Sequence, residues 1–252
     1  MVRHSDFMKG LVPFLLGSVF ALAGSQQAVA YRPFDFTDAA VADVNELETE
    51  LGPFAFRQSQ DERTLIAPQY VINYGYAKNW ELVFEGRGEH PQAPADDTRS
   101  RLVGNALSLK GVLREGALQD KPGPSIATEF GVLLPGIHDE QGFGASVLGI
   151  VSQRWSWGTI HFNVGAELTR EHNTDVSVGA IIEGPFKWTV RPVAELRYER
   201  EFGVAETKSA LIGAIWRVRD NLSFDVGVKE AWVNQRPQTE IRGGLTFAFS
   251  VR

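Results

Sequence analysis

The sequence predicts an all-β fold: a transmembrane antiparallel β-barrel of about twelve strands, preceded by a cleaved signal peptide. Three observations lead to this prediction. Apolar and polar residues alternate with a period of two along successive stretches of the chain, which is the pattern of strands with one apolar face. After the first thirty residues, no apolar run approaches the roughly twenty residues that a membrane-spanning helix needs. Tryptophans gather beside short connections that would lie at one edge of the sheet.

Residues 1–30 have the features of a signal peptide. A basic head with Arg3 and Lys9 precedes the apolar run 11–23, which is too short to span a bilayer. Ala28-Val29-Ala30 then supplies a small-x-small cleavage site. A membrane anchor or a buried helix would fit the short run and its small-residue end less well. We therefore expect an exported protein whose mature chain starts at Tyr31.

The strands of the first half follow an N-terminal leader segment, residues 31–45, which lacks a clean period of two; the barrel is expected to occupy residues 46–252. The expected outward rows are Leu47, Thr49 and Leu51; Ile66, Pro68, Tyr70, Ile72, Tyr74 and Tyr76; Trp80, Leu82 and Phe84; Leu107, Leu109, Gly111 and Leu113; Ile126, Thr128, Phe130, Val132 and Leu134. Residues 144–153 are nearly all small or apolar, so alternation assigns them no faces. Pro68 and Pro192 interrupt strand patterns, and bulges are expected there.

The second half alternates more cleanly. Its outward rows are Ile160, Phe162, Val164, Ala166 and Leu168; Val176, Val178, Ala180 and Ile182; Trp188, Val190, Pro192, Ala194, Leu196 and Tyr198; Ala210, Ile212, Ala214 and Trp216; Leu222, Phe224, Val226 and Val228. The C-terminal strand closes the series, which gives an even number of strands, as bacterial single-chain barrels require.

The connections between strands carry a second pattern. Alternate connections are short, at 77–79, Ser156, 184–187 and 219–221, whereas 115–123 is long where a short turn is expected. Beside the short ones lie five of the six tryptophans: Trp80, Trp155, Trp157, Trp188 and Trp216. With both chain ends in the periplasm, these residues form an aromatic girdle at one rim. A soluble β-sandwich would instead scatter its tryptophans through the core.

Charged residues occupy the face opposite the apolar rows. In a barrel this face meets a confined lumen, where unpaired charge is costly. Acids and bases are close to balanced, which predicts cross-strand pairs and a partly filled, hydrated interior. The candidate lumen-lining residues are Glu81, Glu85, Lys110, Arg114, Glu129, His161, Glu167, Glu183, Arg191, Glu195, Arg197, Glu199, Arg217, Asp225, Lys229 and Arg242. Two interpretations stay open: the charges brace the lumen, or they build a selective path for a solute.

Several function classes find little support. The net charge of −6 disfavours a nucleic-acid partner, and the absence of cysteine excludes thiol chemistry. The five histidines form no cluster for a metal, and no glycine-rich turn predicts a nucleotide or other cofactor. His161 and Asn163 point inward, but the sequence places no serine beside them. Arg197 lies between Glu195 and Glu199, which favours ion pairing over glycoside chemistry. An enzyme is therefore not expected.

The C-terminal strand carries a possible assembly motif. Its residues Arg242, Gly244, Phe247 and Phe249 resemble the assembly signal on the last strand of bacterial outer-membrane β-barrels. Three residues follow the aromatic pair, where most such proteins stop. An ordinary amphipathic strand is the alternative for this stretch alone.

From about Arg32 to Phe249, the chain resembles a family of outer-membrane transporters that is often labelled as belonging to the MetA pathway of phenol degradation. The resemblance rests on RPFDFTDAAVAD, APQYVINYGYAKNWEL, EFGVLLP and GGLTFAF. It implies an outer-membrane barrel and passage of small solutes, aromatic or hydrophobic ones among them. It supplies no motif of binding residues.

Together, these features predict a protein of the bacterial outer membrane, most simply a narrow channel or transporter for small solutes. A structural or adhesive barrel whose lumen is closed by salt bridges is the alternative, and an outer-membrane enzyme is a lesser one. The expected partners are outer-membrane lipid, the barrel assembly machinery and a small-molecule solute.

Overall fold

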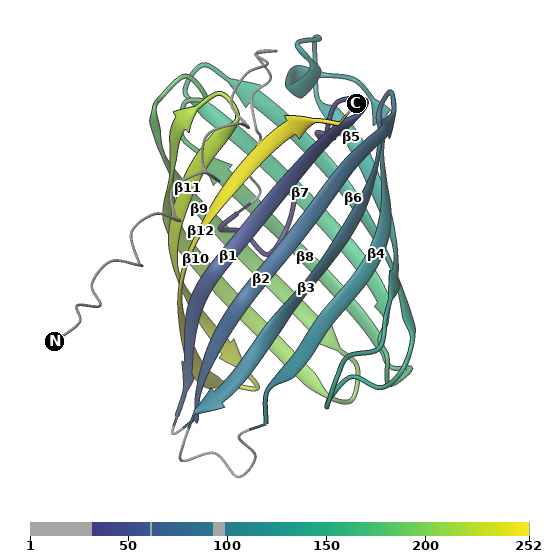
Figure 1. The fold of residues 1–252 in the computed structure, drawn as a ribbon, viewed down its shortest axis with the longest axis vertical. Coiled ribbons are helices and arrows are strands. Elements are labelled where there is room, and N and C mark those ends of the chain that lie inside the picture. The colour runs from purple at the N-terminus through teal and green to yellow at the C-terminus, as the bar shows by residue number, and fades with distance from the viewer. Residues whose placement is uncertain (1–31, 61, 93–98, 252) are drawn as a thin grey trace, which may run out of the picture.

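The computed structural model describes residues 32–60, 62–92 and 99–251. In this part of the chain, twelve antiparallel strands close into a barrel in which each strand pairs with its neighbours in sequence and β1 pairs with β12 (Figure 1). The strands are β1 Glu46–Ser59, β2 Glu62–Ala77, β3 Trp80–Gln92, β4 Arg101–Arg114, β5 Ser125–Leu133, β6 Gly144–Trp155, β7 Gly158–Leu168, β8 Thr174–Glu183, β9 Val190–Glu201, β10 Ala205–Arg219, β11 Leu222–Val233 and β12 Arg236–Ser250. The predicted fold class and strand number are confirmed. The predicted signal peptide, residues 1–30, lies outside the described residues.

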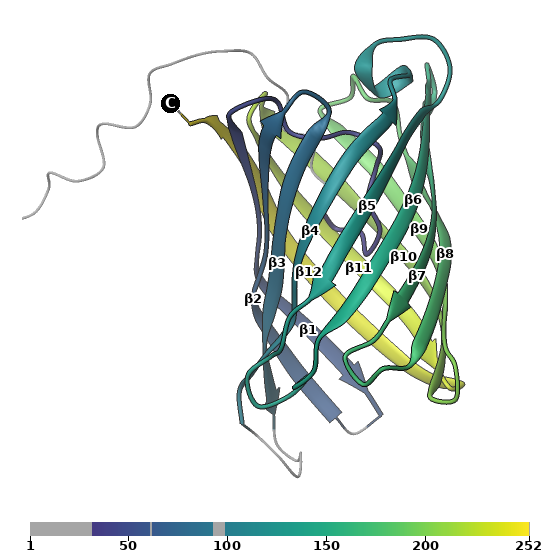
Figure 2. The ribbon, with the colours of Figure 1, turned by 90° about the vertical axis from the view of Figure 1, so that its right-hand side faces the viewer.

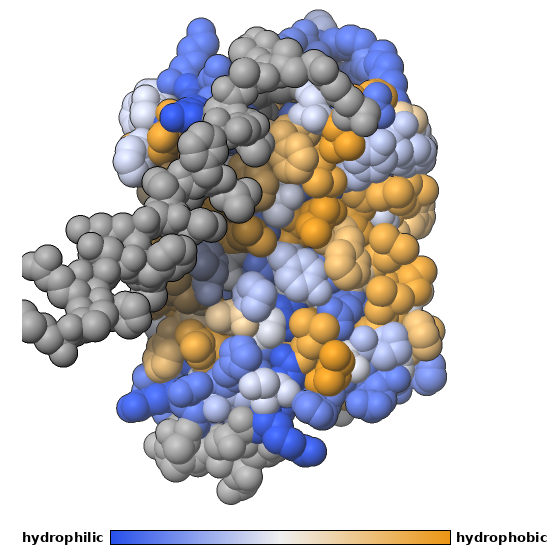
Figure 3. Space-filling view, in the orientation of Figure 1, coloured by the Kyte–Doolittle hydropathy of each residue, from blue (hydrophilic) through white to orange (hydrophobic). Residues whose placement is uncertain are grey.

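The barrel is apolar outside and polar inside. Large apolar side chains are exposed on its outer wall, with Ile212 69% and Leu196 64% exposed. Among the described residues, buried polar and charged side chains outnumber buried hydrophobic ones by 28 to 17. In the space-filling view, apolar residues gather at middle height between hydrophilic rims (Figure 3). Such a band is what a lipid-facing barrel presents to hydrocarbon. None of the described helical segments has the length and hydropathy to cross a bilayer.

The alternation places nearly every predicted outward row on the outer wall, but Ile66 is an exception. Ile66 is buried inside, because the β2–β3 register shifts between Ile66 and Gln69 and the faces of β2 are reversed beyond that point. This shift is the irregularity expected at Pro68. The bulge expected at Pro192 does not occur: β9 pairs with β10 without interruption there, and the pairing of Pro192 with β8 has already ended at Val193.

The structure shows which residues of β6 face outward and which face inward. Ala145, Val147 and Val151 are exposed outside, whereas Ile150 and Ser152 are buried inside. Because both faces carry small or apolar residues, the period of two is invisible in the sequence.

The two rims of the barrel differ. We call the rim where β1 begins and β12 ends the near rim, and the opposite one the far rim. The five predicted tryptophans all lie at the near-rim ends of strands or in near-rim connections, and Trp155 stacks on Trp157 with ring centroids 5.4 Å apart. Far-rim connections are not uniformly long: Asn234 and Gln235 alone join β11 to β12, both with positive φ. Positive φ at both central residues suits the tight turns of β-hairpins.

Residues 32–45 run inside the barrel. In Figure 2 this purple segment passes between the walls before it joins β1 at the near rim. Phe36, Asp38 and Ala39 are buried, although the segment contains no strand and no helix. We call residues 32–45 the luminal segment. The sequence predicted a leader at this place, and it did not predict that the leader would occupy the lumen.

Glycines occupy positions of the inner wall that lie against the luminal segment. A Cβ atom on Gly244 of β12 would lie 2.2 Å from Nε of Arg32, and one on Gly179 of β8 would lie 2.6 Å from the ring of Phe36. Neither distance is possible for a real Cβ. The missing side chains at these two positions therefore allow the luminal segment to approach the wall closely.

Candidate functional site

The luminal segment is held at its start by charged groups of β1, β11 and β12. The Arg32 guanidinium lies 3.5 Å from the Asp225 carboxylate, and the backbone N–H of Arg32 donates a hydrogen bond of 3.1 Å to Glu50. Asp35 pairs with Arg242 at 2.8 Å and also with Lys229. These pairs neutralise charges that would otherwise be buried alone.

The wall carboxylate of Glu195 anchors the middle of the segment. It accepts hydrogen bonds from the backbone N–H groups of Asp35 at 2.9 Å and Phe36 at 2.8 Å. The Arg197 guanidinium lies 4.8 Å from the centroid of the Phe36 ring, within the range of a cation–π contact. Two neighbouring inward residues of β9 thus fix one turn of the segment.

The end of the segment is bonded to four more strands. Asn163 donates to the Thr37 carbonyl at 2.9 Å, and Lys110 donates to the Thr37 hydroxyl at 3.2 Å. The N–H of Ala39 donates to Ser152 at 3.0 Å, and the N–H of Ala42 donates to Glu81 at 2.6 Å. The segment crosses the lumen with polar contacts on most sides.

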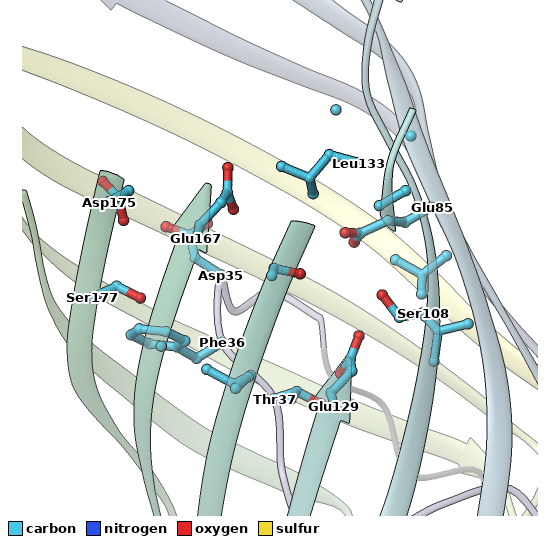
Figure 4. A pocket seen from close by; sticks show the side chains of 18 of the residues that line it. Asp35, Phe36, Thr37, Glu85, Ser108, Glu129, Leu133, Glu167, Asp175 and Ser177 are labelled. Carbon is cyan, nitrogen blue, oxygen red and sulfur yellow. The ribbon is translucent and has the colours of Figure 1, made fainter. Parts of the chain in front are cut away.

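A cavity of about 540 Å³ lies between the luminal segment and the far-rim connections. Phe34, Asp35, Phe36 and Thr37 form the part of its lining that belongs to the segment. Carboxylates of several strands surround the same space, as the close-up shows (Figure 4). We call this cavity the outer chamber.

The outer chamber is acidic. Its acidic lining residues are Asp35, Glu50, Glu81, Glu85, Glu129, Glu140, Glu167, Glu171, Asp175, Glu199 and Glu201, and its basic ones are Arg32, Arg87, Lys110, Arg170 and Arg197. Eleven acids face five bases, whereas the predicted inner row as a whole is closer to balance. The imbalance arises because bases such as Lys229 and Arg242 contact the luminal segment instead of the chamber.

The structure distributes the predicted lumen-lining residues over four places. Glu81, Glu85, Lys110, Glu129, Glu167, Arg197 and Glu199 line the outer chamber. Glu195, Asp225, Lys229 and Arg242 contact the luminal segment. His161, Glu183 and Arg191 form a buried group, while Arg217 and Arg114 lie at the near-rim ends of β10 and β4. Arg217 and Arg191 share the Phe186 ring, at 5.9 and 5.5 Å from its centroid. These near-rim arginines therefore lie apart from the chamber.

A buried hydrogen-bond chain joins Ser152, His161 and Glu183. Ser152 Oγ lies 2.8 Å from His161 Nδ1, and His161 Nε2 lies 2.9 Å from Glu183 Oε1. All contacts are satisfied if Ser152 donates to Nδ1 while it accepts from the Ala39 N–H, so that Nε2–H donates to Glu183. Ser152 is fully buried, and Glu183 also pairs with Arg191 at 3.0 Å. A substrate cannot reach a hydroxyl enclosed in this way, so the chain serves to hold the luminal segment.

Ser152 was not predicted from the sequence as a neighbour of His161. The signal was present in the hairpin turn. A two-residue turn at Ser156 and Trp157 pairs Trp155 with Gly158, and counting back along both strands brings Ser152 opposite His161. The prediction lacked the register between β6 and β7, because alternation within β6 does not show which of its residues face inward.

The long near-rim connection, residues 115–124, has a structural reason. It contains a short 3-10 helix, Ala117–Gln119, and the side chain of Gln119 donates 3.0 Å to the Ala39 carbonyl of the luminal segment. Hydrogen bonds from Lys121, Asn79 and Lys78 lower the pKa of Glu115 to about 2. Glu115 is thus charged at neutral pH and joins this connection to the β2–β3 turn. The connection is long because it reaches the segment.

The last strand has the two faces that its sequence predicts. Ile241 and Phe249 are exposed outside, and the ring of Phe249 stacks on that of Phe247 at 6.2 Å. Arg242 and Gly244 face the lumen, where both contact the luminal segment. Arg242 and Gly244, the inward half of the predicted assembly motif, therefore seat residues 32–35.

The comparisons with known proteins concern this fold. No protein-family model matches the sequence, and a search of curated proteins found no match. The chain is similar to the solved COG4313 outer membrane channel from Pseudomonas putida F1, with 10% identity, a TM-score of 0.63, and coverage of 86% of this chain and 100% of that one. It is also similar to the KdgM porin solved in complex with disordered oligogalacturonate, with 12% identity, a TM-score of 0.53, and coverage of 81% and 99%. The chain thus has the fold of outer-membrane β-barrel channels.

Proposed function

We propose that the protein is a channel or transporter of the bacterial outer membrane for small solutes, with the near rim in the periplasm and the far rim outside. The observation that supports this most is the outer chamber, a polar cavity of about 540 Å³ inside a lipid-facing barrel. A barrel that served only as an anchor would not need a polar cavity between the luminal segment and the far rim. The luminal segment lies between the chamber and the near rim, and it controls passage to the periplasm.

A closed structural barrel is the second candidate. The favouring observation is the number of contacts that fix the luminal segment, including the pairs of Asp35 with Arg242 and of Arg32 with Asp225. Liposome swelling with the refolded mature protein separates the two candidates. A channel raises the swelling rate above that of protein-free liposomes by an amount that depends on solute size, whereas a closed barrel leaves the rate unchanged. Absence of swelling with every solute would refute the channel.

We further propose that the solutes include aromatic or hydrophobic molecules. This class of solute is implied by the resemblance of RPFDFTDAAVAD and GGLTFAF to transporters of the phenol-degradation type. The acidic lining favours neutral or cationic solutes over anions such as the oligogalacturonate bound by the KdgM porin. Swelling rates for phenol, benzylamine and benzoate at equal concentration, each taken relative to protein-free liposomes, compare the three charge types on one ring.

Export and barrel formation are expected to leave a measurable mark. We expect the mature protein to begin at Tyr31 and to migrate faster on a gel before boiling than after, because a closed barrel has no free strand edge and resists detergent. N-terminal sequencing of protein from outer membranes checks the first point. A chain that starts at Met1, or one released by a carbonate wash, would contradict the prediction.

The aromatic pair of the last strand is proposed to act in assembly. Phe247→Ala together with Phe249→Ala is expected to leave synthesis and signal cleavage intact and to reduce the amount of protein in the outer membrane severalfold. The physical reason is that the rings present a paired apolar surface on the outer face of β12. Val226→Ala with Val228→Ala, on the outer face of β11, is the control for lost lipid contact alone. Equal membrane levels of the two double variants would remove the assembly role.

A further inference from the structure

The outer chamber contains carboxylates that its own bases do not neutralise. Each base of the chamber has an acidic partner: Arg87 pairs with Glu89, Lys110 with Glu81, Arg170 with Glu140, Arg197 with Glu199 and Arg32 with Asp225. Among the described residues, by contrast, no hydrogen bond or ion pair reaches the side chains of four other lining carboxylates that lie on strands. They are Glu85, Glu129, Glu167 and Asp175.

Asp175 is the most informative of the four. Its side chain lies on the chamber wall, only 8% of the residue is exposed, and nothing in the described part of the chain donates to it. A buried carboxylate without a partner is costly, and such groups point to a missing ligand or ion. In Figure 4 the carboxylates of Asp175 and Glu167 lie together at one side of the chamber.

The strand register makes the arrangement still less favourable for the empty chamber. Glu167 lies directly opposite Asp175 across the β7–β8 pair, and Asp175 lies opposite Glu201 across β8–β9. Like charges placed directly opposite each other destabilise a sheet. A cation between these carboxylates would turn the repulsion into attraction.

The size and lining of the chamber indicate an organic cation. No group of three or more acidic or histidine side chains among the described residues has the spacing of a metal site. A cavity of about 540 Å³ is within the range of small-molecule sites and far larger than one ion. Phe36, Leu133 and Leu148 add apolar surface beside the carboxylates.

We propose that the outer chamber binds small organic cations, an ammonium group on an apolar body, with Glu167 and Asp175 as the principal partners of the ammonium group. The proposal names a solute class for the channel and so rests on the proposed function. Binding itself does not need an open passage, so the two can be tested separately.

The test is calorimetric titration of the folded full-length mature protein in nonionic detergent with three probes of one chain length. They are hexylammonium, hexanol and hexanoate, each corrected for partition into empty micelles. Hexylammonium is expected to bind about tenfold or more tightly than the other two, the scale of a charge-assisted hydrogen bond. Equal affinity for hexylammonium and hexanol would overturn the proposal, because the apolar wall alone would then account for binding.

The decisive variant is Glu167→Gln with Asp175→Asn. It removes the facing charges, so it should fold at least as well as the wild type, as its shift on unboiled gels would show. Its affinity for hexylammonium is expected to fall about tenfold, with hexanol unaffected. The matched control is Glu206→Gln with Glu230→Gln, which removes the same charge from strands that do not line the chamber.

The outcomes separate the two proposals. Equal loss of affinity in both double variants would show a general charge effect and refute the site. Unchanged hexylammonium affinity in the chamber variant would refute the site as well. The site would also be refuted if the carboxyl groups of Glu167 and Asp175 were protonated, and therefore neutral, at the pH of the titration. Tight, variant-sensitive binding by a protein that never swells liposomes would support the site and refute the channel.

Discussion

Removal of residues 33–42 is expected to raise the single-channel conductance of the barrel severalfold. These residues cross the lumen on the near-rim side of the outer chamber. They contact β6, β7 and β9 by hydrogen bonds. Without them, the space that they occupy fills with water and joins the chamber to the near rim. Planar bilayers with the refolded protein provide the measurement. The strands remain intact, because β1 begins at Glu46 and pairs with β2 and β12.

A reversible tether tests whether the same segment must move during transport. Ala39 belongs to one buried cluster with Ala127 of β5 and Ile150, and the chain contains no cysteine, so Ala39→Cys with Ala127→Cys introduces a single cysteine pair for a disulfide. Oxidation is expected to stop solute entry into liposomes, and a reductant is expected to restore it. The single variant Ala127→Cys controls for the reagents. Uptake that continues through the oxidised double variant would place the solute path beside a fixed segment.

The sequence predicted the barrel because its strands obey a local rule. A residue that faces lipid must be apolar and its neighbour in sequence faces the lumen, so alternation can be counted along each strand. The rule failed at Ile66, where a register shift reverses the faces, and it was silent in β6, where both faces are small or apolar. Both cases depend on pairing with another strand, which a period within one strand does not record.

The location of the luminal segment depends on contacts that are far apart in the sequence. Arg32 finds its partner at Asp225, and Asp35 finds its partners at Lys229 and Arg242. These three wall residues were predicted to line the lumen and to take part in cross-strand pairs, and no contact with the leader was predicted. The acidic excess of the outer chamber follows from the same contacts, because bases that bind the segment are not available to the chamber.

Asp35→Ala is expected to lower the free energy of unfolding by about 3 kcal/mol, the scale measured when one partner of a buried ion pair is removed. Asp35 is the ion-pair partner of Lys229, and it also pairs with Arg242, which keeps Glu240. The substitution therefore leaves the Lys229 ammonium group in a confined space without its carboxylate. Water in the lumen reduces the penalty, which places it at the lower end of that scale. Urea unfolding of the barrel in lipid vesicles, followed by tryptophan fluorescence, gives the measurement.

A double-mutant cycle shows whether the effect belongs to the ion pair. Lys229→Ala alone should also destabilise the barrel, but Asp35→Ala with Lys229→Ala should cost less than the sum of the two single changes, since no charge is then left unpaired. Val44→Ala, at the exposed end of the luminal segment, controls for a change in the segment that removes no ion pair. If Asp35→Ala also loosens the segment, its conductance will rise toward that of the 33–42 deletion. Strictly additive free energies, with unchanged conductance, would mean that the segment is held by its backbone hydrogen bonds to Glu195, Ser152 and Glu81 instead.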